Sequence, residues 1–191
     1  MRNITKGSLI WAAAALVLAP VSARADGYFT PWVGMSVLSA KDEGHRAFGV
    51  TTGYMGAGVF GFEGDFAYSP QFFGLREEFG ANYAMTAFGN FILGVPIGGT
   101  EGAGVRPFVS GGFGLSRTHA DGGRVFNLSQ STNSFAYDLG AGMMGFFNQH
   151  VGLRGDVRYL RLLEDTARGP GTDVDPGRLH VWRVSAGVTF R

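Results

Sequence analysis

Apolar and polar residues alternate along much of this chain, and this alternation restricts its fold more than any other feature. In the segment 151–160 the odd-numbered positions are apolar or glycine, while three even-numbered positions are Arg154, Asp156 and Arg158. Successive side chains of a strand point to opposite faces, so the pattern predicts a strand with one apolar and one polar face. The same pattern recurs in the segments 59–68, 134–147 and 182–190. We therefore expect an all-β fold.

Counting such segments along the chain predicts eight antiparallel strands. We place them at 28–38, 46–55, 59–68, 82–95, 105–116, 134–147, 150–162 and 178–190. Two of these strands contain one proline each, Pro31 and Pro107. Because proline removes a donor from the hydrogen-bond ladder, we expect both prolines near strand starts or bulges.

Short and long connections between these strands largely alternate. Gly56-Ala57-Gly58 and Asn148-Gln149 predict tight turns, whereas 69–81, 117–133 and 163–177 are long and polar or rich in Gly and Pro. Outer-membrane barrels have short periplasmic turns and long external loops. The segment 96–104 is the exception, because it is rather long for an inner turn.

The distribution of aromatic residues favours a membrane barrel over a soluble β-sandwich or a lipocalin-like barrel. With the first strand rising from the periplasm, two girdles of aromatic residues flank an apolar band. The outer girdle contains Tyr68, Tyr83, Phe135, Tyr159 and Trp182, and the inner girdle contains Phe29, Tyr54, Phe60, Phe147 and Phe190. An unpaired strand edge in lipid is costly, so the sheet must close. The prediction is an eight-stranded antiparallel up-and-down transmembrane β-barrel.

The first 25 residues have the features of a secretory signal peptide. Arg2 and Lys6 precede the apolar run 9–19, and Ala23-Arg24-Ala25 is a small-x-small cleavage site. The barrel domain is then 26–191, and removal of Arg2, Lys6 and Arg24 with the leader changes the formal net charge from +1 to −2. This weak charge gives no case for nucleic acid. The chain has no cysteine, so disulfides and thiolate metal sites are excluded, and its 32 glycines are typical of closely packed strands.

Charged residues fall on the face opposite the aromatic residues, which is the lumen face of a barrel. They are Glu63, Asp65, Arg106, Asp138, Arg154, Asp156, Arg158 and Arg183. Buried charges must pair, so we hypothesise an interior ion-pair network that plugs the lumen. A proton or ion path is the alternative interpretation of the same residues.

Several stretches resemble the bacterial outer-membrane β-barrel domain family, which is related to the small OmpA/OmpX-type and porin-family barrels. They are FGNFILGVPIG (88–98), VRPFVSGGFGL (105–115), the run 135–161 with its Arg-x-Asp-x-Arg-Tyr pattern, and the closing strand 183–190. The resemblance covers essentially the whole barrel domain and implies a fold, since the family shares no reaction. It also implies recognition of the last strand by the outer-membrane assembly machinery. In such barrels the final residue is often aromatic, whereas here Phe190 is followed by Arg191.

No pattern in the sequence indicates a catalytic, cofactor-binding or metal-binding site. Ser116 and His119 are close in sequence but match no hydrolase motif. We expect His45, His119 and His180 near the outer loops and His150 at an inner turn. The loop aspartates Asp121, Asp165, Asp173 and Asp175 are interpreted as solvated charges, with a site for a divalent or lipopolysaccharide-bridging cation as the alternative.

The expected function is therefore that of a small, non-catalytic outer-membrane protein with a structural or surface-interaction role. The best candidate contact residues are Phe72, Phe73, Arg76 and Phe79 in the second loop. Expected partners are outer-membrane lipid and lipopolysaccharide, the assembly machinery and an extracellular ligand of the loops. A narrow pore for small solutes is the first alternative, and a lipid-modifying enzyme of the outer membrane is the second.

Overall fold

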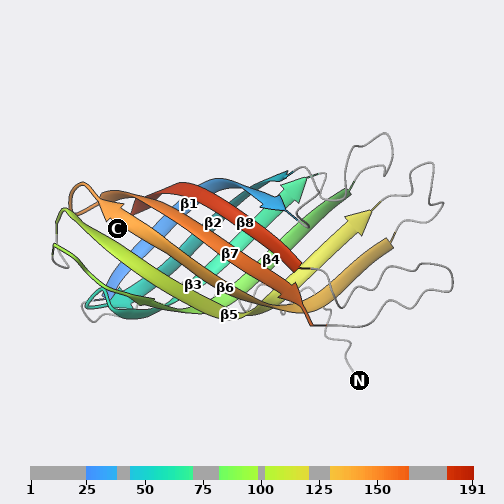
Figure 1. Cartoon of the computed structure of the whole chain (residues 1–191), viewed down its shortest axis with the longest axis horizontal. Helices are drawn as coiled ribbons and strands as arrows, with labels where there is room; N and C mark the ends of the chain where they lie inside the picture. Colours follow the sequence, from blue (N-terminus) through green and yellow to red (C-terminus); the bar gives the residue numbers. More distant parts are fainter. Residues whose placement is uncertain (1–24, 38–43, 71–81, 99–101, 121–129, 164–179) are drawn as a thin grey trace, which may run out of the picture.

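The computed structural model is a single sheet that closes on itself (Figure 1). It describes residues 25–37, 44–70, 82–98, 102–120, 130–163 and 180–191. Eight antiparallel strands follow one another in chain order around the wall, and β1 pairs with β8 to close it. They are β1 (Ala25–Val37), β2 (His45–Gly56), β3 (Phe60–Pro70), β4 (Asn82–Gly94), β5 (Gly104–Ala120), β6 (Gln130–Phe146), β7 (Val151–Leu162) and β8 (His180–Phe190). The predicted eight-stranded up-and-down barrel is confirmed.

The pairing register fixes the dimensions of the barrel. Starting at Ala25 and passing once around the wall through paired residues, the path returns to β1 at Met35, a displacement of ten residues (from 25 to 35). The intermediate partners are Gly56, Phe60, Leu93, Val109, Ala141, Val157 and Val184. Eight strands with this stagger tilt by about 40° and enclose a backbone radius of about 8 Å. Side chains from opposite walls therefore meet inside.

Short turns gather at one end of the barrel, which we call the turn end, and the C-terminus lies there too (Figure 1). Between β2 and β3, Ala57 and Gly58 both have positive φ, and Val59 N donates to Gly56 O at 3.0 Å. Two positive φ angles are typical of a type I′ turn, whose twist matches that of the flanking strands. Between β6 and β7, Asn148 Oδ1 accepts hydrogen bonds from the backbone N–H groups of His150 and Val151, both at 2.8 Å. Both predicted tight turns are confirmed.

The connection after β4 is shorter than its sequence indicates. Ile97 and Val105 exchange backbone hydrogen bonds of 2.8 and 2.9 Å, so the ladder continues past the end of β4. Gly98 and Gly102 then adopt positive φ, which favours glycine. The connection that the sequence indicated over 96–104 is therefore shortened to the residues between Ile97 and Val105.

Two sequence-based expectations need correction. Residues 117–120 and 130–133 were predicted to lie in a long connection, but they belong to β5 and β6. This hairpin extends past the apolar band, where neither face has to be apolar, so hydrophobic alternation could not reveal it. Pro31 lies in the middle of β1 rather than near its start or at a bulge; the pairs Phe29–Phe190 and Trp32–Gly187 on either side keep one register. Pro107 does lie near the start of β5.

Candidate functional site

The lumen is filled by side chains in three successive layers, and the layer nearest the turn end is apolar. We call it the inner cluster; it consists of Tyr28, Met55, Ile92, Phe108, Met144 and Phe146, all buried. These residues come from β1, β2, β4, β5 and β6, so the cluster reaches across the barrel. At a backbone radius of about 8 Å, side chains of this size from opposite parts of the wall reach one another.

Above the inner cluster lies a buried ion-pair network centred on Glu63 of β3. Arg154 Nη1 lies 2.9 Å from Glu63 Oε2, and Arg158 Nη2 lies 2.5 Å from Glu63 Oε1. Tyr28 Oη also donates a hydrogen bond to Glu63 Oε2 at 2.7 Å. The carboxylate of Glu63, whose side chain is fully buried, thus has both oxygens satisfied by charged or hydroxyl donors.

Two further carboxylates complete this network on the side of β6 and β7. Asp156 Oδ2 accepts from Arg154 Nε at 2.8 Å, and its Oδ1 accepts from Ser185 Oγ at 2.9 Å and lies 3.4 Å from Arg158 Nε. Asp138 Oδ2 lies 2.8 Å from Arg158 Nη1. We call Glu63, Asp138, Arg154, Asp156 and Arg158 the central network. Arginine is suited to this role because its planar fork can bind two carboxylates at once.

Asp65 and Arg183 form a separate buried pair beside the central network. Arg183 Nη2 lies 2.6 Å from Asp65 Oδ1, and Thr51 Oγ1 donates to Asp65 Oδ2 at 2.8 Å. The guanidinium carbon of Arg183 stands 4.3 Å from the ring centroid of Trp32. The pair is therefore covered by an aromatic face, which favours a cation.

The structure places all eight predicted polar residues inside the barrel but does not join them in one network. Arg106 lies toward the turn end, apart from the two ion-pair groups. Its Nη1 is 3.7 Å from Met55 Sδ, and its guanidinium carbon is 5.5 Å from the ring centroid of Phe146. Arg106 thus packs against the inner cluster.

On the side of the ion pairs away from the turn end, the buried apolar residues form two separate groups, which we together call the outer cluster, and buried serines such as Ser69, Ser116 and Ser134 lie on the same lumen face. Its buried residues are Trp32, Ala47, Ala67, Ala84, Phe88, Ala136, Leu160 and Val181. The sequence analysis singled out only charged side chains for the lumen, so it did not predict that large apolar side chains such as Tyr28, Trp32 and Phe108 form clusters there. Strand parity was the available signal: Tyr28 and Trp32 occupy even positions of β1, opposite in face to the exposed Phe29 and Val33.

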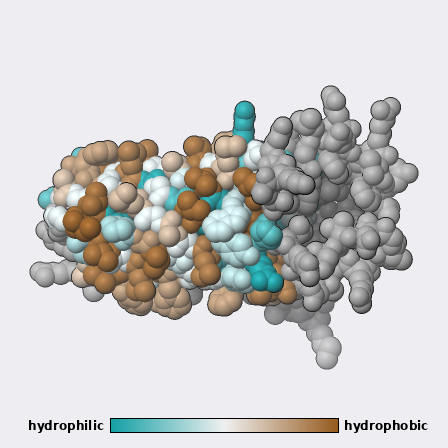
Figure 2. Space-filling model, in the orientation of Figure 1, coloured by the Kyte–Doolittle hydropathy of each residue, from teal (hydrophilic) through white to brown (hydrophobic). Residues whose placement is uncertain are grey.

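The outward face of the wall is apolar over most of its height, and Figure 2 shows hydrophobic side chains spread over the described surface. Aromatic contacts form at both ends of this band. Near the turn end Phe62 and Phe91 have ring centroids 4.5 Å apart, and near the other end Tyr159 and Trp182 have centroids 5.1 Å apart. Two aromatic girdles flanking an apolar band are typical of a barrel that crosses a bilayer.

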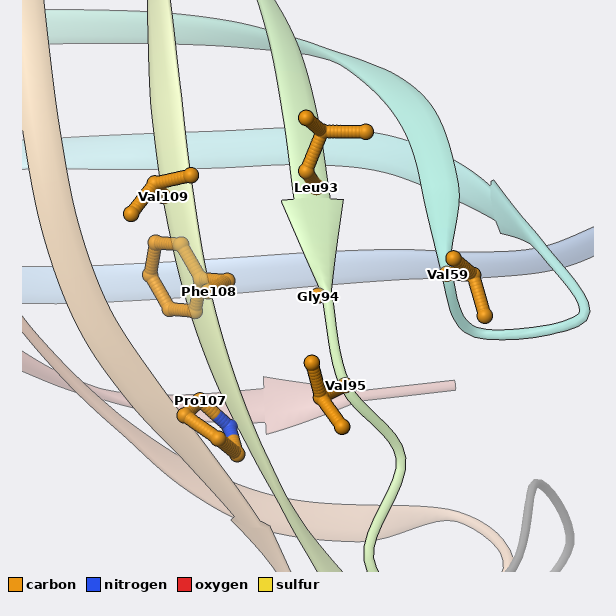
Figure 3. A pocket seen from close by; sticks show the side chains of 7 residues that line it. All are labelled: Val59, Leu93, Gly94, Val95, Pro107, Phe108 and Val109. Carbon is orange, nitrogen blue, oxygen red and sulfur yellow. The ribbon is translucent and has the colours of Figure 1, made fainter.

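A shallow apolar hollow of about 470 Å³ lies on the wall near the turn end (Figure 3). Its lining residues are Val59, Leu93, Gly94, Val95, Pro107, Phe108 and Val109. Four of these side chains, Val59, Leu93, Val95 and Val109, are exposed. None of the lining residues carries a charge or a side-chain hydrogen-bonding group, so the hollow supplies no groups for catalysis.

The remaining candidates from the sequence do not form a site in the described residues. Ser116 points into the barrel and His119 lies on the opposite face of β5, where its ring centroid is 5.1 Å from that of Tyr83. His45 and His180 begin β2 and β8 at the end away from the turns, and His150 lies in a turn, as predicted. Within the described ranges no three His, Asp or Glu side chains are grouped to hold a metal ion. Phe72, Phe73, Arg76, Phe79 and the four loop aspartates lie outside the described residues, as do residues 1–24 of the predicted signal peptide.

Comparison with known proteins agrees with this geometry. The family model of the outer membrane protein beta-barrel domain matches residues 11–190. The chain therefore belongs to the outer-membrane protein β-barrel domain family, whose members are proteins of the Gram-negative outer membrane. A search of curated protein sequences found no match.

Solved structures of small outer-membrane barrels share the fold at low sequence identity. Neisserial surface protein A (NspA) has a TM-score of 0.62 at 16% identity, over 86% of this chain and 96% of NspA. The N-terminal β-barrel domain of OprF from Pseudomonas aeruginosa has a TM-score of 0.59 at 15% identity, with the same coverages. The outer membrane protein OprG from Pseudomonas aeruginosa has a TM-score of 0.54 at 11% identity, over 87% of this chain and 96% of OprG. At these identities the similarity establishes the fold alone.

Proposed function

We propose that the protein is a non-catalytic structural barrel of the outer membrane with a sealed lumen, whose contacts with other molecules are made by its external loops. The observation that carries the proposal is the position of the ion pairs between two apolar clusters. The inner cluster lies toward the turn end, and the outer cluster lies on the opposite side. A pore needs a continuous water-filled path, and the large apolar side chains of both clusters leave less room for one.

The ion pairs themselves also favour a sealed lumen. Glu63 and Arg158 have fully buried side chains, and each contacts at least two charged partners. Separating such charges without water to replace their partners is costly, so the network resists rearrangement. A proton or ion path through Asp138 and Asp156 would need these contacts to exchange.

Planar-bilayer recording of the purified full-length barrel tests the sealed lumen. Insertion is first shown by the shift in gel mobility between unheated and boiled samples. We expect no discrete current steps from barrels that pass this test. Regular current steps in the same preparation would overturn the sealed lumen and favour the pore for small solutes.

External loops are the remaining part of the proposal, and the connection 71–81 between β3 and β4 is the first to test. The chain has no cysteine, so a single introduced thiol reports on one position. We expect Phe73→Cys to react with a membrane-impermeant maleimide on intact cells. Gln149→Cys, in the turn between β6 and β7, is the matched control and should react only after the outer membrane is opened. The reverse pattern would invert the orientation and overturn the assignment of contact loops.

A further inference from the structure

The lumen face of the described wall carries charges of both signs, whereas the exposed charges of its outward face are all positive. The acidic side chains that the structure places, Glu63, Asp65, Asp138 and Asp156, all point into the lumen and are buried. The charged residues exposed on the outward face of the described strands are three arginines, Arg46, Arg117 and Arg161. The described part of the chain therefore offers these arginines no carboxylate on their own face.

All three arginines lie near the end of the barrel away from the turns. The pairing register and a rise of about 3.3 Å per residue place their Cα atoms within about 5 Å of a common height. This height is just beyond the aromatic girdle, since Arg161 follows Tyr159 by two positions and pairs with His180, two positions from Trp182. In Figure 2, strongly hydrophilic side chains stand near this end of the described wall. The level corresponds to the headgroup zone of one leaflet.

Two of the arginines belong to a polar patch across β5, β6, β7 and β8. Arg117 pairs with Asn133, and Arg161 pairs with Tyr137 on one side and His180 on the other. We call these five residues the β5–β8 patch. It is bordered on the membrane side by two aromatic rings of the girdle, whose centroids are 5.1 Å apart.

The spacing of the two arginines in the patch suits two anionic groups and not one. Arg117 and Arg161 are separated by two strand spacings and four residues along the strand, which places their Cα atoms about 16 Å apart. Arg46, on β2, lies at a similar height but pairs with Met35, outside the patch. Arg46 therefore carries the same charge as the two arginines of the patch, but its paired residue Met35 supplies no side-chain donor for a sugar hydroxyl.

We propose that the β5–β8 patch binds the phosphate groups of a phosphorylated glycolipid in the outer leaflet. Arginine binds phosphate oxygens through two parallel N–H donors, and Asn133, Tyr137 and His180 add hydrogen-bonding groups suited to sugar hydroxyls. A headgroup zone contains less water than bulk solvent, so the attraction between arginine and phosphate is stronger there. The site extends the proposed function, because it concerns the wall and not the lumen or the loops.

Native mass spectrometry of the full-length barrel, released from vesicles in mild detergent, tests the proposal. The probes are diphosphorylated lipid A, lipid A without phosphates, and phosphatidylglycerol. We expect diphosphorylated lipid A to bind the wild-type barrel best. Arg161→Gln should weaken that binding about tenfold, because the variant loses charge-assisted hydrogen bonds to a phosphate. Arg117→Gln combined with Arg161→Gln should weaken it at least about twentyfold.

Arg46→Gln is the matched control, since it removes the same charge at a similar height outside the patch. It should change lipid A binding less than about twofold, because Arg46 makes no hydrogen bond to a phosphate held in the patch. Arg117→Lys with Arg161→Lys should retain part of the binding, because lysine keeps the charge but loses the planar fork. The heat-dependent gel shift confirms that each variant is folded.

Three results would overturn the proposal. Equal binding of lipid A without phosphates would assign recognition to acyl chains and aromatic rings. Equal binding of phosphatidylglycerol would show that any anionic lipid suffices. An equal loss in Arg46→Gln and Arg161→Gln would show that charge alone, and not the patch, controls binding.

Discussion

Arg158 on β7 and Glu63 on β3 are 95 residues apart in the chain, and their side chains meet across the lumen at 2.5 Å. The two strands are not neighbours in the sheet, since β4, β5 and β6 separate them. The ion pair therefore connects opposite parts of the wall directly. Its loss should affect the whole barrel and not only one hairpin.

Glu63→Gln should lower the free energy of unfolding by about 3–5 kcal/mol, because Arg154 and Arg158 both lose a buried counter-charge. Urea unfolding in lipid vesicles, followed by tryptophan fluorescence, measures this change. Arg46→Gln is the control, and this exposed position should change stability by less than about 0.5 kcal/mol. Equal stability of Glu63→Gln and wild type would show that the network contributes nothing to folding.

Asp65 and Arg183 should behave as a coupled pair in a double-mutant cycle. Asp65→Leu and Arg183→Leu should each destabilise the barrel by about 3–5 kcal/mol, since each leaves one buried charge without its partner. The double variant should lose less than the sum, with a coupling of about 1–3 kcal/mol. Additive losses in urea unfolding would contradict the pairing at 2.6 Å.

Asp156→Ala should lower the thermal stability of the barrel without making its lumen conduct ions. Asp156 contacts Arg154, Arg158 and Ser185, so its removal should lower the thermal midpoint of the gel-mobility shift. The inner cluster stays intact in this variant, so bilayer recordings should remain without current steps. A large conductance in Asp156→Ala would show that the charged residues, and not the apolar layers, close the lumen.

Gly49→Ala should destabilise the barrel by about 1–3 kcal/mol through overpacking. A Cβ at this position would overlap Trp32 Cζ2 and the backbone oxygen of Phe66. Gly89→Ala is a matched control, because a Cβ there meets no atom within 4 Å. Unfolding midpoints in urea compare the two variants, and equal values would contradict the close contact of Trp32 with β2.

Ala57→Asn should stabilise the barrel by about 0.5–1 kcal/mol, because asparagine tolerates the left-handed backbone of a type I′ turn better than alanine does. The φ angle of Ala57 is 49°. Ala141→Gly, in the exposed face of β6, is the opposite control and should destabilise by about the same amount. Urea unfolding midpoints measure both changes, and a loss of stability in Ala57→Asn would argue against the turn type.

Alternation was sufficient to predict the strands where one face meets lipid and the other the lumen, as in β3 and β7. It could not predict the outer part of the β5–β6 hairpin, because Arg117 and Thr118 both lie beyond the apolar band. Strand parity was sufficient to place the charged residues on the lumen face. It could not predict that they form the central network, the separate pair of Asp65 and Arg183, and Arg106 apart from both. Which carboxylate meets which arginine depends on the stagger between strands, and that stagger is a property of the closed sheet and not of any one segment.

The ten-residue stagger between Ala25 and Met35 determines the radius of the barrel, so the strand register and the packing inside the lumen depend on each other. A slip of two residues at any one seam would preserve which side chains face inward, yet it would change the radius by about 0.7 Å. A narrower wall could not hold Phe108, Phe146 and the arginines together, and a wider one would leave them without contact. The packing of side chains in the lumen therefore favours the native strand register over registers shifted by two residues, although all of these registers place the same residues inward.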